Sequence, residues 1–295
     1  MPVNAAKARP GWTFWGAVLW LAVVVVSAAT AGWWAVPAFD AMDWDNPGAA
    51  PGTRVDNAVL QNADETQKGP YVYRLGTDTM GRDVTSRLIY GARVSLLVGL
   101  LAPVIGFILG GILGCLAGYF RGRLDSIIVA AMDVILAFPG IVLLLALTFY
   151  LGPSLRNLVI ALGLLTIPAF SRVARANTLT LRDLEFVQAA RLTGAGHLSI
   201  LVREIIPNVI APMTAYALLI VSFMIMAEGA LSFLGLGVPA PVPSWGGMIA
   251  EGREVLEEAP HVSMIPAAVM FLTVISFNLI GDNLRSLAER RTSQL

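Results

Sequence analysis

The sequence predicts an all-α membrane protein with six transmembrane helices. Of its 295 residues, 56% are hydrophobic and only 14% are charged, whereas a soluble domain carries about 25% charged residues. The apolar residues gather in long runs, and about 20 apolar residues in a row can cross the hydrocarbon core of a bilayer as a helix. A helix also satisfies its own backbone hydrogen bonds within lipid, which an open sheet cannot do.

Six apolar runs have the length of a span or nearly so. They cover residues 14–36, 94–120, 127–150, 158–171, 209–236 and 264–280. The fourth run is short and contains Pro168, so we expect its helix to continue to Val173. Cys115, the only cysteine, lies in the second run, which excludes an intrachain disulfide and predicts an inert, buried thiol.

The distribution of basic residues predicts that both termini lie in the cytoplasm. With the N-terminus inside, twelve of the 20 lysines and arginines fall in cytoplasmic segments and two in short outer loops. The other six fall in the long first outer loop, where charge has less influence on orientation. The chain then divides into a cytoplasmic end with a first anchor (1–36), an extracytoplasmic segment (37–92), a transmembrane domain (93–283) and a cytoplasmic tail (284–295).

The first apolar run permits a second interpretation. Lys7 and Arg9, an apolar core and the Ala-Thr-Ala sequence at 29–31 are also typical of a secretory signal with its cleavage site. Apolar residues continue to Val36, however, which favours a retained span. The stretch that follows, 37–75, is rich in Asp, Asn, Pro and Gly, and we expect a loop with little core of its own.

The sequence lacks the motifs of several classes of function. It has no GxxxxGK[ST] nucleotide-binding loop, no Gly-Lys pair and no Gly-x-Ser-x-Gly nucleophile motif. His197 and His261, the only histidines, are far apart, which argues against a histidine metal site. The formal net charge is zero, so no overall basic bias points to nucleic acid. We therefore expect no catalytic residue, metal or cofactor in this chain, and any ATP must be bound by another subunit.

The second run carries a glycine at every fourth position. These residues are Gly106, Gly110, Gly114 and Gly118. The spacing places them on nearly one face of a helix, where the missing side chains let another helix approach closely. We interpret them as helix-packing residues, in either a sliding seam or an ordinary membrane contact.

The segment before the second run is predicted to be a turn followed by the start of a helix. Gly76 and Gly81 bracket polar residues, as in a turn, and Asp83 can cap a helix that begins at Val84. We take Asp83 and Asp78, which lies inside the turn, as candidates for an extracytoplasmic or gating role.

Charged residues at or within the predicted spans are few. Arg82, Arg87 and Arg93 lie where the chain enters the membrane, and can meet acids on a docked protein, lipid phosphates or aspartates of their own segment. Asp133 and Glu228 lie inside predicted spans, where ionisable groups suggest function unless they bond to backbone or a neighbouring helix. The three arginines and Glu228 are further candidates for a gating role, and the scarcity of buried charge argues against proton-coupled transport.

The predicted cytoplasmic segment 176–208 is the most informative part of the chain. Asp183 and Glu185 suit the start of a helix because their charge complements its dipole. Gly194 or Gly196 can end that helix in a left-handed cap. A second short helix should follow and break at a proline near its end. Two short amphipathic helices joined by a bend are suited to a groove on a partner protein.

This segment resembles the EAA loop of ABC importer permeases, whose pattern is Glu-Ala-Ala, three residues, Gly, nine residues and Ile-x-Leu-Pro. The matching residues are Ala189, Ala190, Gly194 and Pro207, and the departures are Gln188 for Glu, Glu204 for Ile and Ile206 for Leu. The resemblance implies that these seven residues couple the membrane helices to an ATPase. The neutral Gln188 removes any implied salt bridge from the first position.

Two further stretches resemble the dipeptide, oligopeptide and nickel subfamily of these permeases, most closely its C-type subunit. Residues 75–96 contain Leu-Gly-Thr-Asp-Thr-Met-Gly-Arg-Asp, and residues 228–246 contain Glu-Gly-Ala-Leu-Ser-Phe-Leu-Gly-Leu-Gly and Pro-Ser-Trp-Gly. With the EAA-like loop, the resemblance covers roughly residues 75–285. It implies the type I ABC importer permease fold and a multi-pass location in the bacterial inner membrane.

The resemblance also implies a complex of several subunits. The expected partners are a homologous B-type permease, two ATPase subunits that hold ATP and Mg²⁺, an extracytoplasmic solute-binding protein and membrane lipid. Import of di- or oligopeptides is the expected function, with nickel or another small solute as alternatives. A rival class, an ATP-independent carrier or channel, predicts broken helices in paired repeats and clustered buried charges, which the sequence does not suggest.

Overall fold

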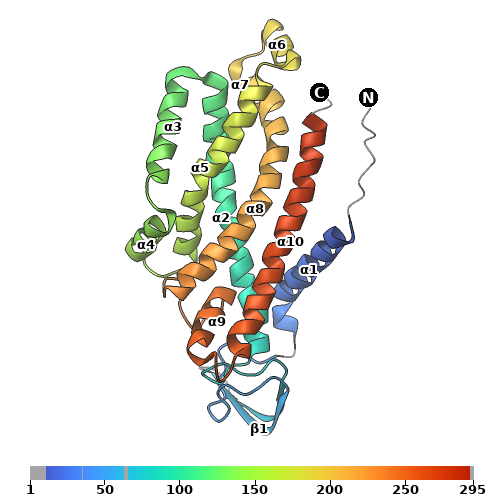
Figure 1. Ribbon diagram of the computed structural model, residues 1–295, viewed down its shortest axis with the longest axis vertical. Coiled ribbons are helices and arrows are strands. Elements are labelled where there is room, and N and C mark those ends of the chain that lie inside the picture. The colour runs from blue at the N-terminus through green and yellow to red at the C-terminus, as the bar shows by residue number, and fades with distance from the viewer. Residues whose placement is uncertain (1–10, 35, 63–65, 293–295) are drawn as a thin grey trace. The chain divides into compact units, whose positions relative to one another are not determined.

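The computed structural model describes residues 11–34, 36–62 and 66–292, and its elements are labelled in Figure 1. Among these residues, five helical stretches are long and apolar enough to cross a membrane. They are α1 (Trp12–Ala29), α2 (Val84–Phe120), α5 (Leu155–Leu181), the stretch His197–Phe233 and the first part of α10 (His261–Thr292). A bent pair of helices passes the same test only when taken together, and the count reaches the six predicted spans if the pair is one span.

The bent pair replaces the third predicted span, which we expected to be continuous over 127–150. α3 (Gly122–Leu136) and α4 (Gly140–Leu151) meet at an angle of 83°. The break falls at residues 137–139, where Pro139 lacks a backbone N–H and disfavours helical geometry at the preceding residue. Hydropathy alone does not register this bend, because both helices are apolar.

The other prolines inside spans do not interrupt them. Pro103, Pro168, Pro212 and Pro266 lie within α2, α5, α8 (Ile206–Phe233) and α10. Membrane helices tolerate such prolines because the freed carbonyl groups find other donors or adjust locally. As a result α5 continues well beyond Val173, to Leu181.

The chain folds into two compact units. The first unit consists of the described residues up to Val98, with Gly152–Leu158 and Ile225–Phe277. It includes α1, which is held at two points: Trp20 Nε1 donates to Thr273 Oγ1 at 3.1 Å, and Arg93 Nε donates to the Ala28 carbonyl oxygen at 2.5 Å. Lys7 and Arg9, on which the predicted orientation partly rests, lie outside the described residues.

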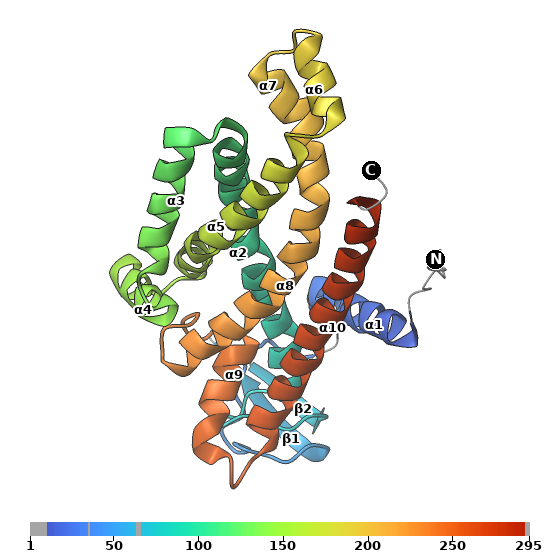
Figure 2. The same cartoon turned by 45° about the horizontal axis from the view of Figure 1, so that its top comes forward.

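Within the first unit, residues 37–75 have more structure than we expected. They contain an antiparallel hairpin of β1 (Thr53–Gln61) and β2 (Thr66–Tyr73), seen in Figure 2 beside α9 (Trp245–Gly252). The hairpin has a small core of Ala41, Leu60 and Tyr73. The expectation of a loop was therefore wrong, because residues 53–61 and 66–73 pair as strands, while the small size of the core agrees with what we expected.

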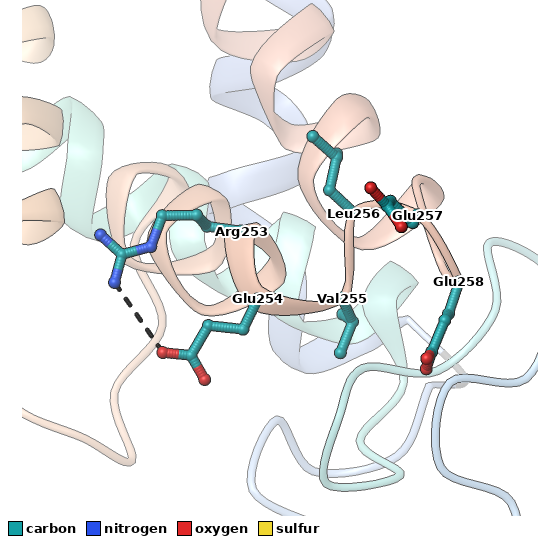
Figure 3. Close-up of a pocket in the computed structure, with 6 residues that line it drawn as sticks. All are labelled: Arg253, Glu254, Val255, Leu256, Glu257 and Glu258. Atoms are coloured by element: carbon teal, nitrogen blue, oxygen red, sulfur yellow. Dashed lines mark ion pairs between the residues drawn. The ribbon is translucent and has the colours of Figure 1, made fainter.

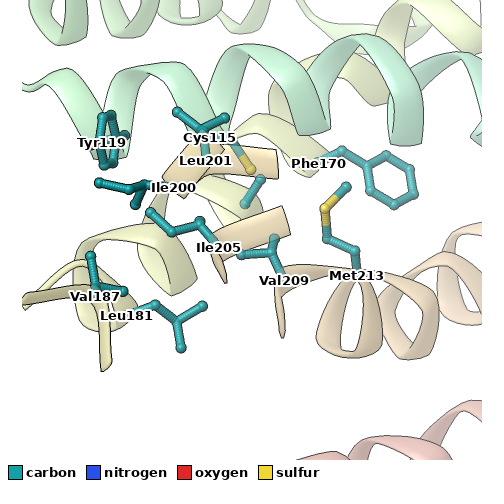
Figure 4. Packing of buried hydrophobic residues seen from close by; sticks show 11 residues of the cluster. Cys115, Tyr119, Phe170, Leu181, Val187, Ile200, Leu201, Ile205, Val209 and Met213 are labelled. Atoms are coloured by element: carbon teal, nitrogen blue, oxygen red, sulfur yellow. The ribbon is translucent and has the colours of Figure 1, made fainter. Parts of the chain in front are cut away.

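The second unit consists of Gly99–Leu151, Val159–Met224 and the described residues from Asn278. Its main core, drawn in Figure 4, joins α2, α5 and the segment between α5 and α8. The ring of Phe170 is fully buried in this core, 5.8 Å from the ring of Phe107 and 5.4 Å from that of Tyr216. Cys115 is buried in this core as a free thiol.

Candidate functional site

The EAA-like loop folds as a helical hairpin within the second unit. α6 (Glu185–Leu192) and α7 (His197–Ile200) are joined by a turn in which Gly194 has φ +84°. The N–H of Ala195 donates to the carbonyl of Ala190 at 3.0 Å, the bond that defines a Schellman cap. Of the two candidate glycines it is therefore Gly194 that ends the first helix, whereas Gly196 has an ordinary φ of −68°.

The expected break at Pro207 is absent. α7 continues through a π-helical turn, Leu201–Ile205, directly into α8, where Pro207 is the second residue. The N–H of Ile206 donates to the Leu201 carbonyl, five residues earlier, as in a π-helix. This wider turn lies directly before Pro207, whose backbone nitrogen has no hydrogen to donate, so the helix continues past the proline. The second helix of the hairpin and the membrane span are thus one continuous helical stretch.

The hairpin is attached to the C-terminal end of α2. Arg182 Nη1 donates to the Tyr119 carbonyl oxygen at 2.6 Å, and the Tyr119 hydroxyl lies 2.9 Å from His197 Nδ1. The Arg191 guanidinium lies 5.6 Å from the centre of the Tyr119 ring. Val187 and Ile200, both labelled in Figure 4, are fully buried in the same core.

The loop residues matched to the EAA pattern divide between an inner and an outer side. Ala190 and Ile206 pack against the core, and Glu204 is half-buried. Gln188 and Ala189 are exposed, and Gln188 Nε2 donates to the Asp183 carbonyl oxygen at 3.1 Å. Only part of the motif is therefore free to meet another protein.

The four glycines of α2 all face α5. A side chain at Gly110 or Gly114 would overlap the Ile167 or the Ser171 carbonyl oxygen, and one at Gly106 or Gly118 would overlap Thr166 or Thr178. The backbones of α2 and α5 lie so close together at these four glycines that even the methyl group of an alanine would not fit. Gly111, on the same helix, instead faces the flexible end of Met213.

A cluster of four charges, three of them buried and Glu251 34% exposed, lies in the first unit. The side chains of Arg82, Arg87 and Asp78 are each only 2% exposed. Asp78 Oδ2 lies 2.6 Å from Arg82 Nε and 3.2 Å from Arg87 Nε, and Glu251 Oε2 accepts from both arginines at 2.6 and 2.9 Å. Of the three alternatives, the structure therefore has the aspartate of their own segment, Asp78, as partner of these two arginines, and adds the distant Glu251, so both are paired within the unit.

Asp83 and Arg93 flank this cluster at the start of α2. Asp83 accepts from the backbone N–H of Ser86 at 3.1 Å and of Thr85 at 3.2 Å, so it caps the helix that begins at Val84 as expected. Burial raises the pKa of Asp83 above its usual range, against the opposing effect of these bonds and of the Tyr71 hydroxyl. Arg93 caps the end of α1 and stacks on the Tyr90 ring at 5.2 Å.

Glu228 is fully buried among hydroxyl groups. Its carboxylate accepts from Ser244 at 2.7 Å, Ser232 at 2.8 Å and Ser95 at 3.4 Å. Ser244 also caps α9 by accepting from the N–H of Gly247 at 3.0 Å. Glu228 thus links α2, α8 and the start of α9 within the first unit.

The sequence assigned no role to Glu251 or to the three serines, although Ser95, Ser232 and Ser244 all lie in the stretches that resemble the permease subfamily. Ser232 follows Glu228 by four residues, which is a detectable helical spacing. The partners of Glu228 on α2 and at the start of α9, Ser95 and Ser244, are distant from it in sequence, so no local spacing pattern identifies them. Asp133, the other charge in a predicted span, pairs with Arg172 of α5 at 2.8 Å, so it too bonds to a neighbouring helix.

The turn after α9 forms a pocket of about 320 Å³ lined by residues 253–258 (Figure 3). Arg253 Nη2 lies 3.8 Å from Glu254 Oε1, and the guanidinium stacks on the Phe233 ring at 4.7 Å. Within the described part of the chain, no group of three or more His, Cys, Asp or Glu residues could hold a metal ion.

Comparison with known proteins identifies the family. Residues 110–294 match the binding-protein-dependent transport system inner membrane component. The chain is 41% identical to the glutathione transport system permease protein GsiD of Pectobacterium atrosepticum and 42% identical to that of Escherichia coli O6:K15:H31. Each match covers 75% of this chain and 74% of the relative.

Solved structures agree on the fold. An inward-facing MetNI methionine ABC transporter matches with a TM-score of 0.58 and 17% identity, over 69% of this chain and 97% of that one. A second crystal form gives 0.57, over 68% and 96%. The fold is that of ABC importer permeases, and the family is a transport permease component. The chain belongs to the family of binding-protein-dependent transport system inner membrane components.

Proposed function

We propose that this permease is a subunit of an ATP-driven importer of small peptides and forms half of its translocation pathway. The substrate class is supported by the relatives at 41–42% identity, which are named for glutathione transport. Glutathione is a tripeptide, so the named cargo of these relatives is a small peptide and not a metal ion.

The observation that carries the coupling part of the proposal is the exposed apolar tip of the α6–α7 hairpin. Leu192 is 89% exposed and Leu198 is 77% exposed, and Ala189 lies exposed on the same hairpin. Large apolar side chains at a predicted cytoplasmic tip are typical of residues that fill a pocket on a partner. We therefore assign the hairpin of residues 185–200 to contact with an ATPase subunit.

The contacts of the hairpin provide a route for motion into the membrane helices. Tyr119 connects the hairpin to the end of α2 through Arg182, Arg191 and His197. α7 connects it to α8 without a break. A displacement of the hairpin would therefore move α2 and α8 together, because neither connection contains a flexible linker.

The remaining partners follow from this role. We propose a homologous B-type permease for the other half of the pathway, two ATPase subunits that bind ATP and Mg²⁺ and hydrolyse the nucleotide, and an extracytoplasmic solute-binding protein. The absence of a nucleotide-binding motif in the sequence supports a division of labour in which this chain performs no bond chemistry.

The test is uptake by the complete complex in liposomes, with ATP supplied on the ATPase side. We expect ATP-dependent uptake of glutathione and trialanine. We also expect Leu192→Asp and Leu198→Asp to lose most co-purifying ATPase, while Leu192→Met, which keeps an apolar side chain, retains it. Normal ATPase association in both Asp variants would contradict the hairpin assignment. Uptake of nickel without uptake of either peptide would contradict the substrate.

A further inference from the structure

The π-helical turn at Leu201–Ile205 adds one residue to the helical stretch that joins the α6–α7 hairpin to α8. The N–H of Ile206 donates to the carbonyl of Leu201, five residues earlier, where an α-helix bonds residues four apart. In the described part of the chain this is the only π-helical turn. An added residue changes the direction of every side chain before it relative to the helix after it.

Pro207 does not by itself account for this turn. Four other prolines lie inside long helices, and each of those helices is α-helical around its proline: Pro103, Pro168, Pro212 and Pro266. Pro212 is the most direct comparison, because it lies on α8 itself. A helix of this protein therefore accommodates a proline without an added residue, and the π-turn has a further cause.

Packing on both sides of the turn supplies that cause. Ile200, Leu201, Ile205, Val209 and Met213 are all buried in the core drawn in Figure 4, and the last four recur every four residues. In an α-helix this spacing turns the buried face by about 40° at each step. A π-turn holds more residues per turn and so turns the face back, which keeps the side chains before and after it in one core.

α2 contacts this stretch on both sides of the π-turn. Before the turn, the Tyr119 hydroxyl lies 2.9 Å from His197 Nδ1. After it, a Cβ at Gly111 would lie 2.8 Å from Met213 Cε. Removal of one residue between these contacts would rotate the hairpin relative to α8 by about 100° and shift it by about 1.5 Å, so both contacts could not be kept.

We propose that the π-turn, held by the packing on both its sides, sets the rotational register between the α6–α7 hairpin and α8 and so directs the hairpin tip toward the ATPase. This inference rests on the proposed docking of the hairpin to an ATPase subunit. Leu201–Ile205 are then positioning residues for coupling. The added residue disturbs no buried contact, because Val202 and Arg203 lie on the exposed side of the turn. Without it, Leu192 and Leu198 at the tip would point in another direction relative to α8.

The first test measures the register directly and requires neither ATPase nor solute. In a Cys115→Ser background, one cysteine pair replaces Tyr119 and His197, and a second pair replaces Gly111 and Met213. Each pair is treated with a short bis-maleimide in the full-length protein, and bridged peptides are quantified by mass spectrometry. The first bridge reports the contact before the π-turn and the second the contact after it, so together they report whether α2 meets both sides at once.

The register is changed by deletion of Val202. Val202→Ala is the matched control, because it removes the same exposed side chain but keeps the number of residues. We expect both bridges in the control. In the deletion variant the yield of at least one bridge should fall about tenfold or more, because such a reaction depends steeply on the placement of the two groups. Unchanged yields of both bridges after the deletion would overturn the proposal.

Pro207→Ala keeps the proposal falsifiable if the deletion variant does not fold. The alanine restores an N–H that can close an α-helical turn, so the proline no longer favours the π-turn. Conversion to an α-helix would rotate Ile200 and Leu201 out of the core, and the burial of two large apolar side chains outweighs one backbone hydrogen bond. We therefore expect both bridges to remain. Loss of either bridge would show that the proline and not the packing holds the turn, which would overturn the proposal.

The second test measures coupling in the complete complex in liposomes. We expect the uptake of trialanine per ATP hydrolysed to fall at least about tenfold on deletion of Val202 and to stay within about twofold of wild type in Val202→Ala and Pro207→Ala. A normal ratio in the deletion variant would overturn the positioning role. Failure of the proposed function is seen elsewhere, as normal ATPase association in Leu192→Asp and Leu198→Asp or as no peptide uptake by the wild type, and the two bridges still report the register in that case.

Discussion

Arg82 Nη2 and Glu251 Oε2 lie 2.6 Å apart, although 169 residues separate them in the sequence. The bond ties the turn before α2 to the end of α9, and Arg87 and Asp78 complete the same cluster. Two buried arginines require both acids, because an unpaired charge in such a position is strongly destabilising. The cluster is therefore a structural element of the first unit.

We expect the loss of a charge in the buried cluster to destabilise the protein much more than the loss of a charge in an exposed ion pair of the same unit. Asp78→Asn keeps the shape of the side chain but removes its charge, and we expect a loss of about 3 kcal/mol and a lower unfolding temperature. Arg54→Gln breaks the exposed pair with Asp56, which is 3.5 Å apart, and should cost less than about 1 kcal/mol. Thermal unfolding of both purified variants checks this, and equal midpoints would contradict it.

The contacts of α2 predict that its neighbouring glycines Gly110 and Gly111 differ in how well they tolerate substitution by alanine. Gly110→Ala places a methyl group against backbone of α5, and we expect overpacking to cost about 1–3 kcal/mol. Gly111→Ala meets only the movable end of Met213 and serves as the matched control. The measurement is the fraction of folded, monodisperse protein in detergent on heating.

The hairpin predicts a contrast between its two glycines. A Cβ at either Gly194 or Gly196 would meet no atom within 4 Å, but only Gly194 has a positive φ. Gly194→Val should therefore strain the backbone by about 1–2 kcal/mol and reduce co-purification of the ATPase. Gly196→Val should retain it. If both variants bind the ATPase normally, the left-handed turn does not set the docking geometry.

The predicted orientation can be tested with exposed positions in each unit. In a Cys115→Ser background, a cysteine at Gln67 in β2 should react with an impermeant reagent added to intact cells. A cysteine at Thr193, in the α6–α7 turn, should react only after the inner membrane is opened. Labelling of Thr193 by the reagent in intact cells would show that the orientation is the opposite of the predicted one. The α6–α7 hairpin would then lie on the wrong side of the membrane to bind an ATPase.

Local features of the sequence predicted several details correctly. Asp83 caps α2, and one of the two glycines proposed for the end of α6, Gly194, ends it, because each feature depends on the geometry of a few consecutive residues. The spans were predictable because each carries its own apolar run. The bend at Pro139 was missed, since many membrane helices continue through proline and the outcome depends on surrounding contacts.

The sequence by itself determined which segments are apolar and long enough to cross a membrane, which loop resembles a coupling motif and to which family the chain is similar. Only the tertiary structure decided which distant groups meet: Arg82 with Glu251, Glu228 with Ser244, and Asp133 with Arg172. Hydropathy and helix caps are short-range properties that can be read along a chain. The partner of a charge depends on how the helices pack, and no local pattern in one sequence records that packing.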